Sequence, residues 1–324
     1  MKKVLTAIVT LLTCIATAQA APASNTVEIV YNGTTATVSV AANISSYVTD
    51  KSEGSSHVKL IQSASVNDAI GEISYILKGT SDDGEFYLEG TYKATVELNG
   101  LTLNNPSGPA INIQNGKRIK VKVNEGTTNT LSDGKNDNYN GCLHIKGHTE
   151  FRSKGTLNVT GNSRHAIYSK EYIQLKNTTI NISGAVKDGI HCKEYFYMES
   201  GTVKIASAGD DGIQVEVDDE IATTGTTSDH EDENSGNFYQ DAGKLDISGY
   251  AGKAIKVDGL IKFKGGSRNF PSTETEDATA IAAITTTQPA ESGCYDLQGR
   301  KVTDARKGIY IFKSGNTTTK RYIK

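Results

Sequence analysis

Residues 166–188 read AIYSKEYIQLKNTTINISGAVKD, and residues 189–211 read GIHCKEYFYMESGTVKIASAGDD. Each segment has 23 residues, and the two align without a gap. Residues 212–253 form a third copy, which opens with GIQVEV, closes with NFYQDAGKLDISGYAGK and carries 19 additional residues between them. A fixed period of this kind dictates architecture, because each repeat is one unit that stacks on its neighbours.

Apolar and polar residues alternate inside each repeat. In the second copy the apolar positions are Ile190 and Cys192, then Phe196 and Met198, then Val203 and Ile205. A period of two indicates strands rather than helices, and the Gly, Ser, Asn and Asp residues between the runs favour turns. Three short strands per repeat predict an all-β protein, a right-handed parallel β-helix, because stacked coils bury the apolar face that one coil cannot bury alone. A β-sandwich with coincidental internal similarity is the alternative.

The register of the repeats predicts which residues stack. Ile167, Ile190, Ile213 and Ile255 open successive coils, so we expect one inward column with about 4.8 Å between rungs. An earlier coil and strand-like runs upstream extend the pattern to roughly six coils. Cys192 falls in another inward column, with Ser169 and Val215, and is expected to be a small core residue.

The chain is expected to divide into five segments. Residues 1–20 hold two lysines, an apolar run and an Ala-Gln-Ala site, which predict a signal peptide and therefore export. We expect a strand-rich cap at 21–95, the β-helix at 96–270, a Thr- and Ala-rich linker at 271–293 and a small β-module at 294–324. The apolar run is too short to span a membrane.

Composition excludes several classes of function. The chain has 34 Lys and Arg against 37 Asp and Glu, so there is no basic excess of the kind that binds nucleic acid. Tryptophan is absent, which excludes a Trp surface for crystalline neutral polysaccharide. No Ser–His–Asp pattern and no Cys/His zinc spacing stands out, and the isolated His57, His148 and His230 are expected to be solvated. We expect a monomer.

Acidic residues predict a metal site. Asp188 stands directly before one Gly-Ile opening, and Asp210 and Asp211 stand directly before the next. The register stacks these residues on adjacent coils, where their carboxylates repel each other unless a hard cation such as calcium binds them. Glu216 and Asp218, close to the acidic insertion, are further candidate ligands.

Two alternatives to a metal site stay open. Lys187 and Lys253 flank the acidic residues and could neutralise them on a solvated turn, or Asp could serve as a turn former before Gly. The insertion at 218–236 is rich in Asp and Glu. Such an insertion maps to a loop on one side of a solenoid, often the binding side, although a solvated acidic loop fits as well.

Lysines form a second pattern on the outward face. Lys146, Lys170 and Lys193 fall in one outward column, and like charges on neighbouring strands disfavour pairing without counter-charge. A polyuronate carries one carboxylate per sugar, so a lysine ladder could match it. The alternative is surface lysines that pair with the adjacent Glu171 and Glu194.

Rings follow the neighbouring outward column, which holds His144, Tyr168, His191 and Gln214. Tyrosine rings could stack on sugar faces. Candidate ligand-binding residues are therefore the three lysines of the ladder together with Tyr168, His191 and Tyr195.

The run NGLTLNNPSGPAINIQNGKRIKVKVNEGTTNTLSDG, followed by the two Asp-Gly-Ile openings, resembles a family of bacterial carbohydrate-binding β-helix proteins. These are similar to catalytically reduced relatives of the family 9 polysaccharide lyases, and the resemblance covers about residues 80–270. It implies a right-handed β-helix that binds calcium and acidic plant polysaccharides such as polygalacturonate. The insertion at 218–236 departs from the family pattern.

The C-terminal segments YDLQGRKV, KGIYI and KRYIK resemble the sorting domains of Bacteroidetes proteins exported by the type IX system. This resemblance implies that the tail engages export machinery and that the protein is secreted or displayed at the cell surface.

Three hypotheses follow for function. The first is calcium-dependent binding of an acidic polysaccharide without catalysis. The second is a polysaccharide lyase, in which calcium acidifies a uronate C5 proton and Lys193 or Lys170 is the base. The third is a surface adhesin or structural protein in which the β-helix is a spacer.

Overall fold

The computed structural model describes residues 21–220, 233–278, 293–297, 300–304, 306–314 and 317–323. The predicted signal peptide, the centre of the acidic insertion and much of the predicted linker lie outside the described residues. The chain forms two compact units, Met1–Asp277 and Ala278–Lys324, and each is described by itself.

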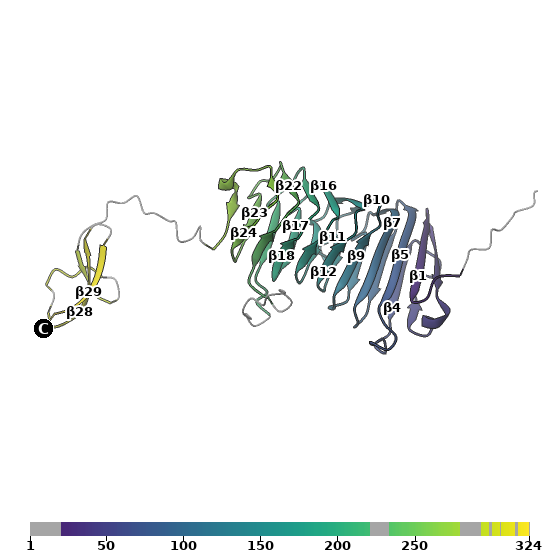
Figure 1. Ribbon diagram of the computed structural model, residues 1–324, viewed down its shortest axis with the longest axis horizontal. Helices are drawn as coiled ribbons and strands as arrows, with labels where there is room; N and C mark the ends of the chain where they lie inside the picture. Colours follow the sequence, from purple (N-terminus) through teal and green to yellow (C-terminus); the bar gives the residue numbers. More distant parts are fainter. Residues whose placement is uncertain are drawn as a thin grey trace, which may run out of the picture. The chain divides into compact units, whose positions relative to one another are not determined.

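The larger unit is a stack of parallel strands (Figure 1). One of its sheets has ten strands within the described residues. These are β3 (Val48–Asp50), β4 (His57–Gln62), β6 (Glu85–Glu89), β8 (Ile111–Gln114), β11 (Gly141–Ile145), β14 (His165–Ser169), β17 (Ile190–Lys193), β20 (Ile213–Glu216), β23 (Ile255–Val257) and β26 (Thr275–Glu276). They are stacked in this order, and every pair is parallel except β3 with β4.

A second sheet contains two further ladders that meet at the long strand β7 (Ala94–Asn105). The first ladder continues from β7 through β9 (Ile119–Val123), β12 (Thr149–Arg152), β15 (Ile173–Leu175), β18 (Tyr195–Met198), β21 (Asn237–Gln240) and β24 (Ile261–Phe263). The other continues through β10 (Thr128–Asp133), β13 (Thr156–Gly161), β16 (Thr179–Ala185), β19 (Thr202–Ile205), β22 (Lys244–Ile247) and β25 (Ser267–Arg268). Each repeat thus supplies one strand to each ladder, which confirms the predicted parallel β-helix.

The N-terminal region continues this stack. The strands β4 and β6 pair in parallel, and β5 (Ile73–Ser81) pairs in parallel with both β7 and β1 (Thr26–Asn32). The parallel ladders therefore begin before residue 96, and the solenoid has about eight turns rather than roughly six. The outer edge of β1 is covered by the antiparallel strand β2 (Thr35–Val40), which protects an edge that could otherwise pair with another chain.

The core is built from inward columns. Ile167 pairs with Ile190, Ile190 with Ile213, and Ile213 with Ile255, all in parallel register. Each of the four side chains is at most 1% exposed, and complete burial of such a side chain contributes about 1.5–3 kcal/mol. The predicted inward column is confirmed, and Cys192 lies buried in the neighbouring column as expected.

Short elements complete the description. Two 3-10 turns, η1 (Ala42–Ile44) and η2 (Ser272–Glu274), belong to the larger unit. The smaller unit is an antiparallel sheet of β27 (Gly293–Tyr295), β28 (Gly308–Ser314) and β29 (Thr317–Ile323). Within the described part of the chain, we find no helix with the length and apolar character that a bilayer crossing requires.

Candidate functional site

A polar pocket of about 340 Å³ lies where the strands β14, β17 and β20 begin. We call it the strand-end pocket. Its charged lining residues are Arg164, Lys187, Lys193, Asp188, Asp210 and Glu216. They come together because successive coils place equivalent turn and strand positions one above another, so residues about 23 positions apart become neighbours.

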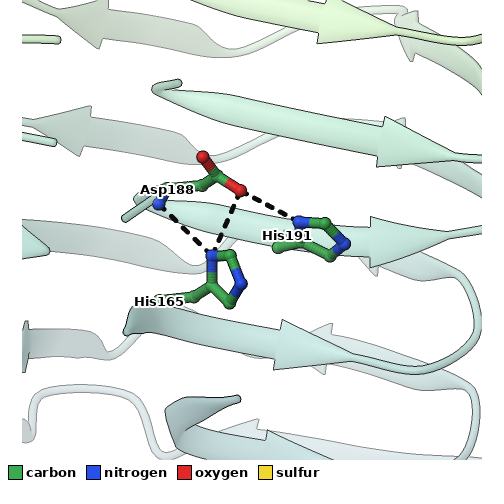
Figure 2. Close-up of side chains that lie close together, drawn as sticks. All are labelled: His165, Asp188 and His191. Carbon is green, nitrogen blue, oxygen red and sulfur yellow. Dashed lines mark hydrogen bonds and ion pairs between the residues drawn. The ribbon is translucent and has the colours of Figure 1, made fainter. Parts of the chain in front are cut away.

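His165, Asp188 and His191 form the buried wall of this pocket (Figure 2). The Asp188 Oδ2 atom lies 2.9 Å from Nδ1 of His191 and 3.1 Å from Nδ1 of His165. Burial alone would raise the pKa of Asp188, but its contacts with the two imidazoles outweigh burial and hold that pKa well below its usual range. Burial lowers the pKa of His165, whereas the contacts of His191 with Asp188 and Glu216 overcome burial and raise the pKa of His191.

The carboxylates of Asp188, Asp210 and Asp211 have oxygen atoms within 4.8 Å of one another. Asp211 Oδ1 accepts a hydrogen bond from the Lys253 backbone at 2.6 Å, whereas the buried Asp211 Oδ2 has no hydrogen-bond partner. Burial raises the pKa of Asp211, and the two neighbouring carboxylates raise it further. A group of oxygen donors with one unsatisfied buried atom suits a hard divalent cation such as calcium.

The two remaining candidate metal ligands have other partners. Glu216 Oε2 lies 3.4 Å from Nε2 of His191. Asp218 is buried, and its carboxylate lies 3.6 Å from Nζ of Lys193. The structure thus brings three of the five predicted ligands together and places Glu216 and Asp218 outside that group.

The predicted neutralisation of the three carboxylates by lysines agrees only in part with the structure. Lys256 Nζ lies 3.8 Å from Asp211 Oδ2. The Lys253 side chain instead donates to the backbone carbonyl of Thr273. Neutralisation of these acids by the Lys253 side chain is therefore contradicted, and Lys256 is the lysine that approaches them.

The predicted lysine ladder is largely compensated by acidic partners. Lys170 Nζ lies 2.6 Å from Glu220, and Lys193 pairs with Asp218 as described. Lys146 is exposed and forms no ion pair with any described residue. Pairing of the lysines with Glu171 and Glu194 is wrong, because those two carboxylates contact a histidine instead.

Two cations that the sequence interpretation did not select as ligand-binding residues line the strand-end pocket. Arg164 has a buried Nε atom without a hydrogen-bond partner, and Lys187 is exposed. Neither forms an ion pair within the described part of the chain. Both occupy the position of Asp210 one or two coils earlier, so their place in the repeat was the signal that could have identified them.

The rings of the outward column stack on one another, which leaves little of their surface open to a ligand. Tyr168 is 8% exposed and stacks on His144 and His191, with ring centroids 5.1 and 5.5 Å apart. Burial lowers the pKa of His144 to about 4. Tyr195 is fully buried and stacks on Tyr172 at 4.7 Å. The expectation that Tyr195 offers its ring to a sugar is therefore contradicted, because no surface of this ring is open.

A second group of titratable residues surrounds His148, which the sequence suggested to be solvated. His148 Nε2 lies 3.0 Å from Glu171 and 3.4 Å from Glu194, and its ring stacks on Tyr172 at 4.1 Å. Burial lowers the pKa of His148, but the two carboxylates outweigh burial and raise it to about 9. The expectation for His148 is wrong, and the residue is a partly buried imidazolium held by two acids.

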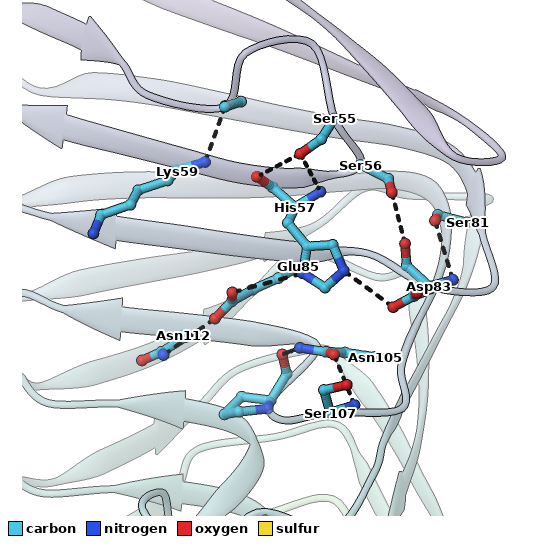
Figure 3. A network of polar contacts seen from close by, with 12 residues as sticks. Ser55, Ser56, His57, Lys59, Ser81, Asp83, Glu85, Asn105, Ser107 and Asn112 are labelled. Atoms are coloured by element: carbon cyan, nitrogen blue, oxygen red, sulfur yellow. Dashed lines mark hydrogen bonds and ion pairs between the residues drawn. The ribbon is translucent and has the colours of Figure 1, made fainter.

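A smaller polar pocket of about 280 Å³ lies near the N-terminal end of the ten-stranded sheet. Figure 3 shows its network, in which His57 Nε2 lies 3.0 Å from Asp83 and Asn112 donates to Glu85. Lys59 places its Nζ 4.8 Å from the centre of the Tyr87 ring. These polar groups satisfy one another, so the strand-end pocket is the stronger candidate site.

Comparison with known proteins identifies a family that matches most of this chain. The model of a family described as "Carbohydrate-binding domain-containing protein" matches residues 62–295. A curated protein of Acetivibrio thermocellus with the same description is 24% identical over 103 residues. That alignment covers 29% of this chain and 36% of the relative, so the chain spans about a third of the length of that protein.

A solved structure gives the corresponding result for the fold. The polysaccharide lyase-like protein from C. thermocellum, described as a gadolinium derivative, matches with a TM-score of 0.56 and 17% sequence identity. The match covers 78% of this chain and 99% of that one. At this identity the likeness concerns the fold alone.

Proposed function

Because the chain belongs to the family of carbohydrate-binding domain-containing proteins, we propose that it is an exported, calcium-dependent protein that binds an acidic, pectin-like polysaccharide without cleaving it. One observation carries this proposal. In the strand-end pocket, Arg164 and Lys187 have no ion-pair partner among the described residues and lie beside a group of carboxylates. A neutral glycan would leave these cations unpaired, whereas a uronate supplies one carboxylate per sugar.

Arg164 is suited to hold such a carboxylate. A guanidinium presents paired donors that match a carboxylate in two parallel hydrogen bonds, and its positive charge is permanent. Lys187 adds a mobile point charge at the exposed rim. Calcium bound by Asp188, Asp210 and Asp211 would supply a further positive charge for uronate oxygens.

The lysine column extends the contact along the stack. Exposed charge pairs contribute only about 0–1 kcal/mol each, and Lys170 and Lys193 must exchange an internal partner for a ligand. A polymer that engages several rungs at once gains through effective concentration. We therefore assign the column a supporting role and the strand-end pocket the main one.

Binding is favoured over cleavage by the surroundings of the candidate bases. A lysine that abstracts a proton needs a lowered pKa. The hydrogen bond with Glu220 raises the pKa of Lys170, and Lys193 Nζ lies 3.6 Å from the buried carboxylate of Asp218. The pairing with Glu220 favours the charged ammonium of Lys170, which cannot accept a proton, and Asp218 engages Lys193 as an internal partner.

The test is a binding titration with polygalacturonate and with a neutral polysaccharide as control, each in the presence of calcium and of chelator. We expect calcium-dependent binding to polygalacturonate alone, weakened by salt through screening. Arg164→Gln should weaken binding about tenfold or more, the loss of one charge-assisted pair. The variant with Lys146→Ala, Lys170→Ala and Lys193→Ala together should lose more affinity than any of its single members.

Five outcomes would overturn parts of this proposal. Equal binding in chelator would refute calcium dependence, and equal binding of the neutral polysaccharide would refute acidic specificity. Formation of unsaturated uronate product by the wild type, but not by Lys193→Ala, would identify a lyase. No binding to any polysaccharide on a glycan array would favour the structural or adhesin role. Recovery of the protein from the cytoplasmic fraction would refute export.

A further inference from the structure

Three buried side chains carry an inference beyond calcium and polysaccharide. We propose that His165, Asp188 and His191 form a binding site for a divalent transition-metal ion of the zinc type, with one coordination position open to the strand-end pocket. Each residue offers one ligand atom, and these atoms lie within 4.8 Å of one another. Figure 2 shows both imidazoles directed at the same carboxylate oxygen.

The distances fit a shared ion. Zinc binds imidazole nitrogen and carboxylate oxygen at about 2.0–2.2 Å in tetrahedral geometry, which places two ligand atoms about 3.3 Å apart. The Asp188 Oδ2 atom lies 3.1 Å from Nδ1 of His165 and 2.9 Å from Nδ1 of His191. Both distances are within a few tenths of an ångström of that separation.

The surroundings hold the ligands in place. The second ring nitrogen of His191 lies 3.4 Å from Glu216 Oε2, and Gln214 donates to the other oxygen of Glu216 at 2.9 Å. Metal-binding histidines commonly have their other ring nitrogen held by a carboxylate in this way. The Asp188 Oδ1 atom accepts the Asp211 backbone N–H at 3.0 Å, which leaves Oδ2 for the ion.

The donor set selects the class of metal. Calcium and magnesium take oxygen ligands, whereas imidazoles suit zinc, copper, iron and nickel. Two imidazoles and one carboxylate therefore favour a transition metal here. Asp210 and Asp211 offer oxygens only and belong to the calcium proposal, so the two ions share Asp188 but no other ligand.

The open position gives the site a role. All three residues line the strand-end pocket of about 340 Å³, so the fourth ligand comes from solvent or from a bound molecule. Three protein ligands with a free position are the arrangement of zinc sites that bind or activate a ligand oxygen rather than serve structure alone. A sugar carboxylate or hydroxyl is the class of ligand that the pocket would present to the ion.

The experiment uses protein without a polyhistidine tag, freed of metal by chelator. Zinc binding is followed by calorimetry, and cobalt binding by visible absorption, which reports tetrahedral nitrogen and oxygen ligands. We expect one zinc ion per chain with micromolar or tighter affinity, and a melting temperature that rises with zinc through mass action. His165→Gln and His191→Gln should each weaken zinc binding more than about 100-fold, and Glu216→Gln about 10–100-fold.

Two control variants separate this site from the neighbouring groups. His148→Gln removes a histidine from the other cluster, and Glu171→Gln removes a carboxylate from it; both should bind zinc as the wild type does. Circular dichroism establishes that each variant is folded. Zinc binding that is absent in the wild type, or unchanged in both folded histidine variants, would overturn the site. Calcium binding in His165→Gln tests the calcium proposal separately.

Discussion

Two clusters of imidazoles and carboxylates lie on neighbouring coils of this β-helix, and they combine the same groups in opposite proportions. The Asp188 cluster has two imidazoles and one carboxylate, from His165, His191 and Asp188. The His148 cluster has one imidazole and two carboxylates, from His148, Glu171 and Glu194. Their contact distances are similar, between 2.9 and 3.4 Å.

The proportions decide what each cluster can do. Two acids around His148 raise its pKa to about 9, so the ring stays charged at neutral pH and the cluster is internally paired. The single carboxylate between His165 and His191 cannot keep both rings charged, and burial lowers the pKa of His165. An imidazole that lines a pocket and has a lowered pKa can bind a ligand, whereas an imidazolium paired with two acids stabilises the fold.

The largest effect is expected at Asp188, which both rings of its cluster share. Asp188→Asn keeps the shape but removes the buried charge that stabilises His191 in its charged form. Loss of one partner from a buried charged network costs about 3 kcal/mol. Urea unfolding of metal-free protein measures this cost as a lower midpoint with an unchanged slope. The matched change Asp210→Asn, at an exposed carboxylate, should alter the free energy of unfolding by no more than about 0.5 kcal/mol.

Glu194 should matter next, because it is buried and has two partners. Its Oε2 atom accepts the Tyr172 backbone N–H at 3.2 Å and contacts His148. Glu194→Gln should destabilise the protein by about 2 kcal/mol, the value of a hydrogen bond to a charged group. Glu171→Gln removes only the contact with the ring and should cost less. Equal costs for the two variants in urea unfolding would contradict this ranking.

The pH dependence of stability should identify the His148 cluster. The folded pKa of about 9 lies above the ordinary value of 6.5, so the stabilisation is fully present below about pH 6.5 and is lost as pH rises through about 9. We expect about 1 kcal/mol across this range, because the side chain is 30% exposed and screened by water. Thermal unfolding from pH 6 to 10 measures it. In His148→Gln this loss of stability at high pH should disappear. A loss of the same size in the variant would show that His148 is not its source.

The smallest effect is expected at the exposed pair of Lys170 and Glu220, whose side chains are 35% and 72% exposed. Lys170→Ala should change the free energy of unfolding by less than about 0.5 kcal/mol, as is usual for surface ion pairs. Thermal unfolding at low and high salt measures it. A cost above about 1 kcal/mol would show that exposure does not separate the stabilising contacts from the weak ones.

The stacking of the chain could be predicted from its sequence, because alternation and a constant period assign every residue to a face and a rung. The inward column of Ile167, Ile190 and Ile213 follows directly, and so does the proximity of Asp188 to Asp210 and Asp211. A repeat of fixed length converts sequence separation into a spacing of about 4.8 Å, so these neighbours needed no further information.

Partners and exposure were decided only by the tertiary structure. Lys170 and Lys193 pair with Glu220 and Asp218 rather than with the glutamates beside them. A long side chain can reach acidic residues on several coils and in the insertion, so the sequence neighbours do not determine its partner. Tyr195 points outward in the repeat, yet it is buried by stacking within a cluster of tyrosines. A repeat pattern determines the direction in which a side chain leaves its strand, and the neighbouring coils determine what it meets.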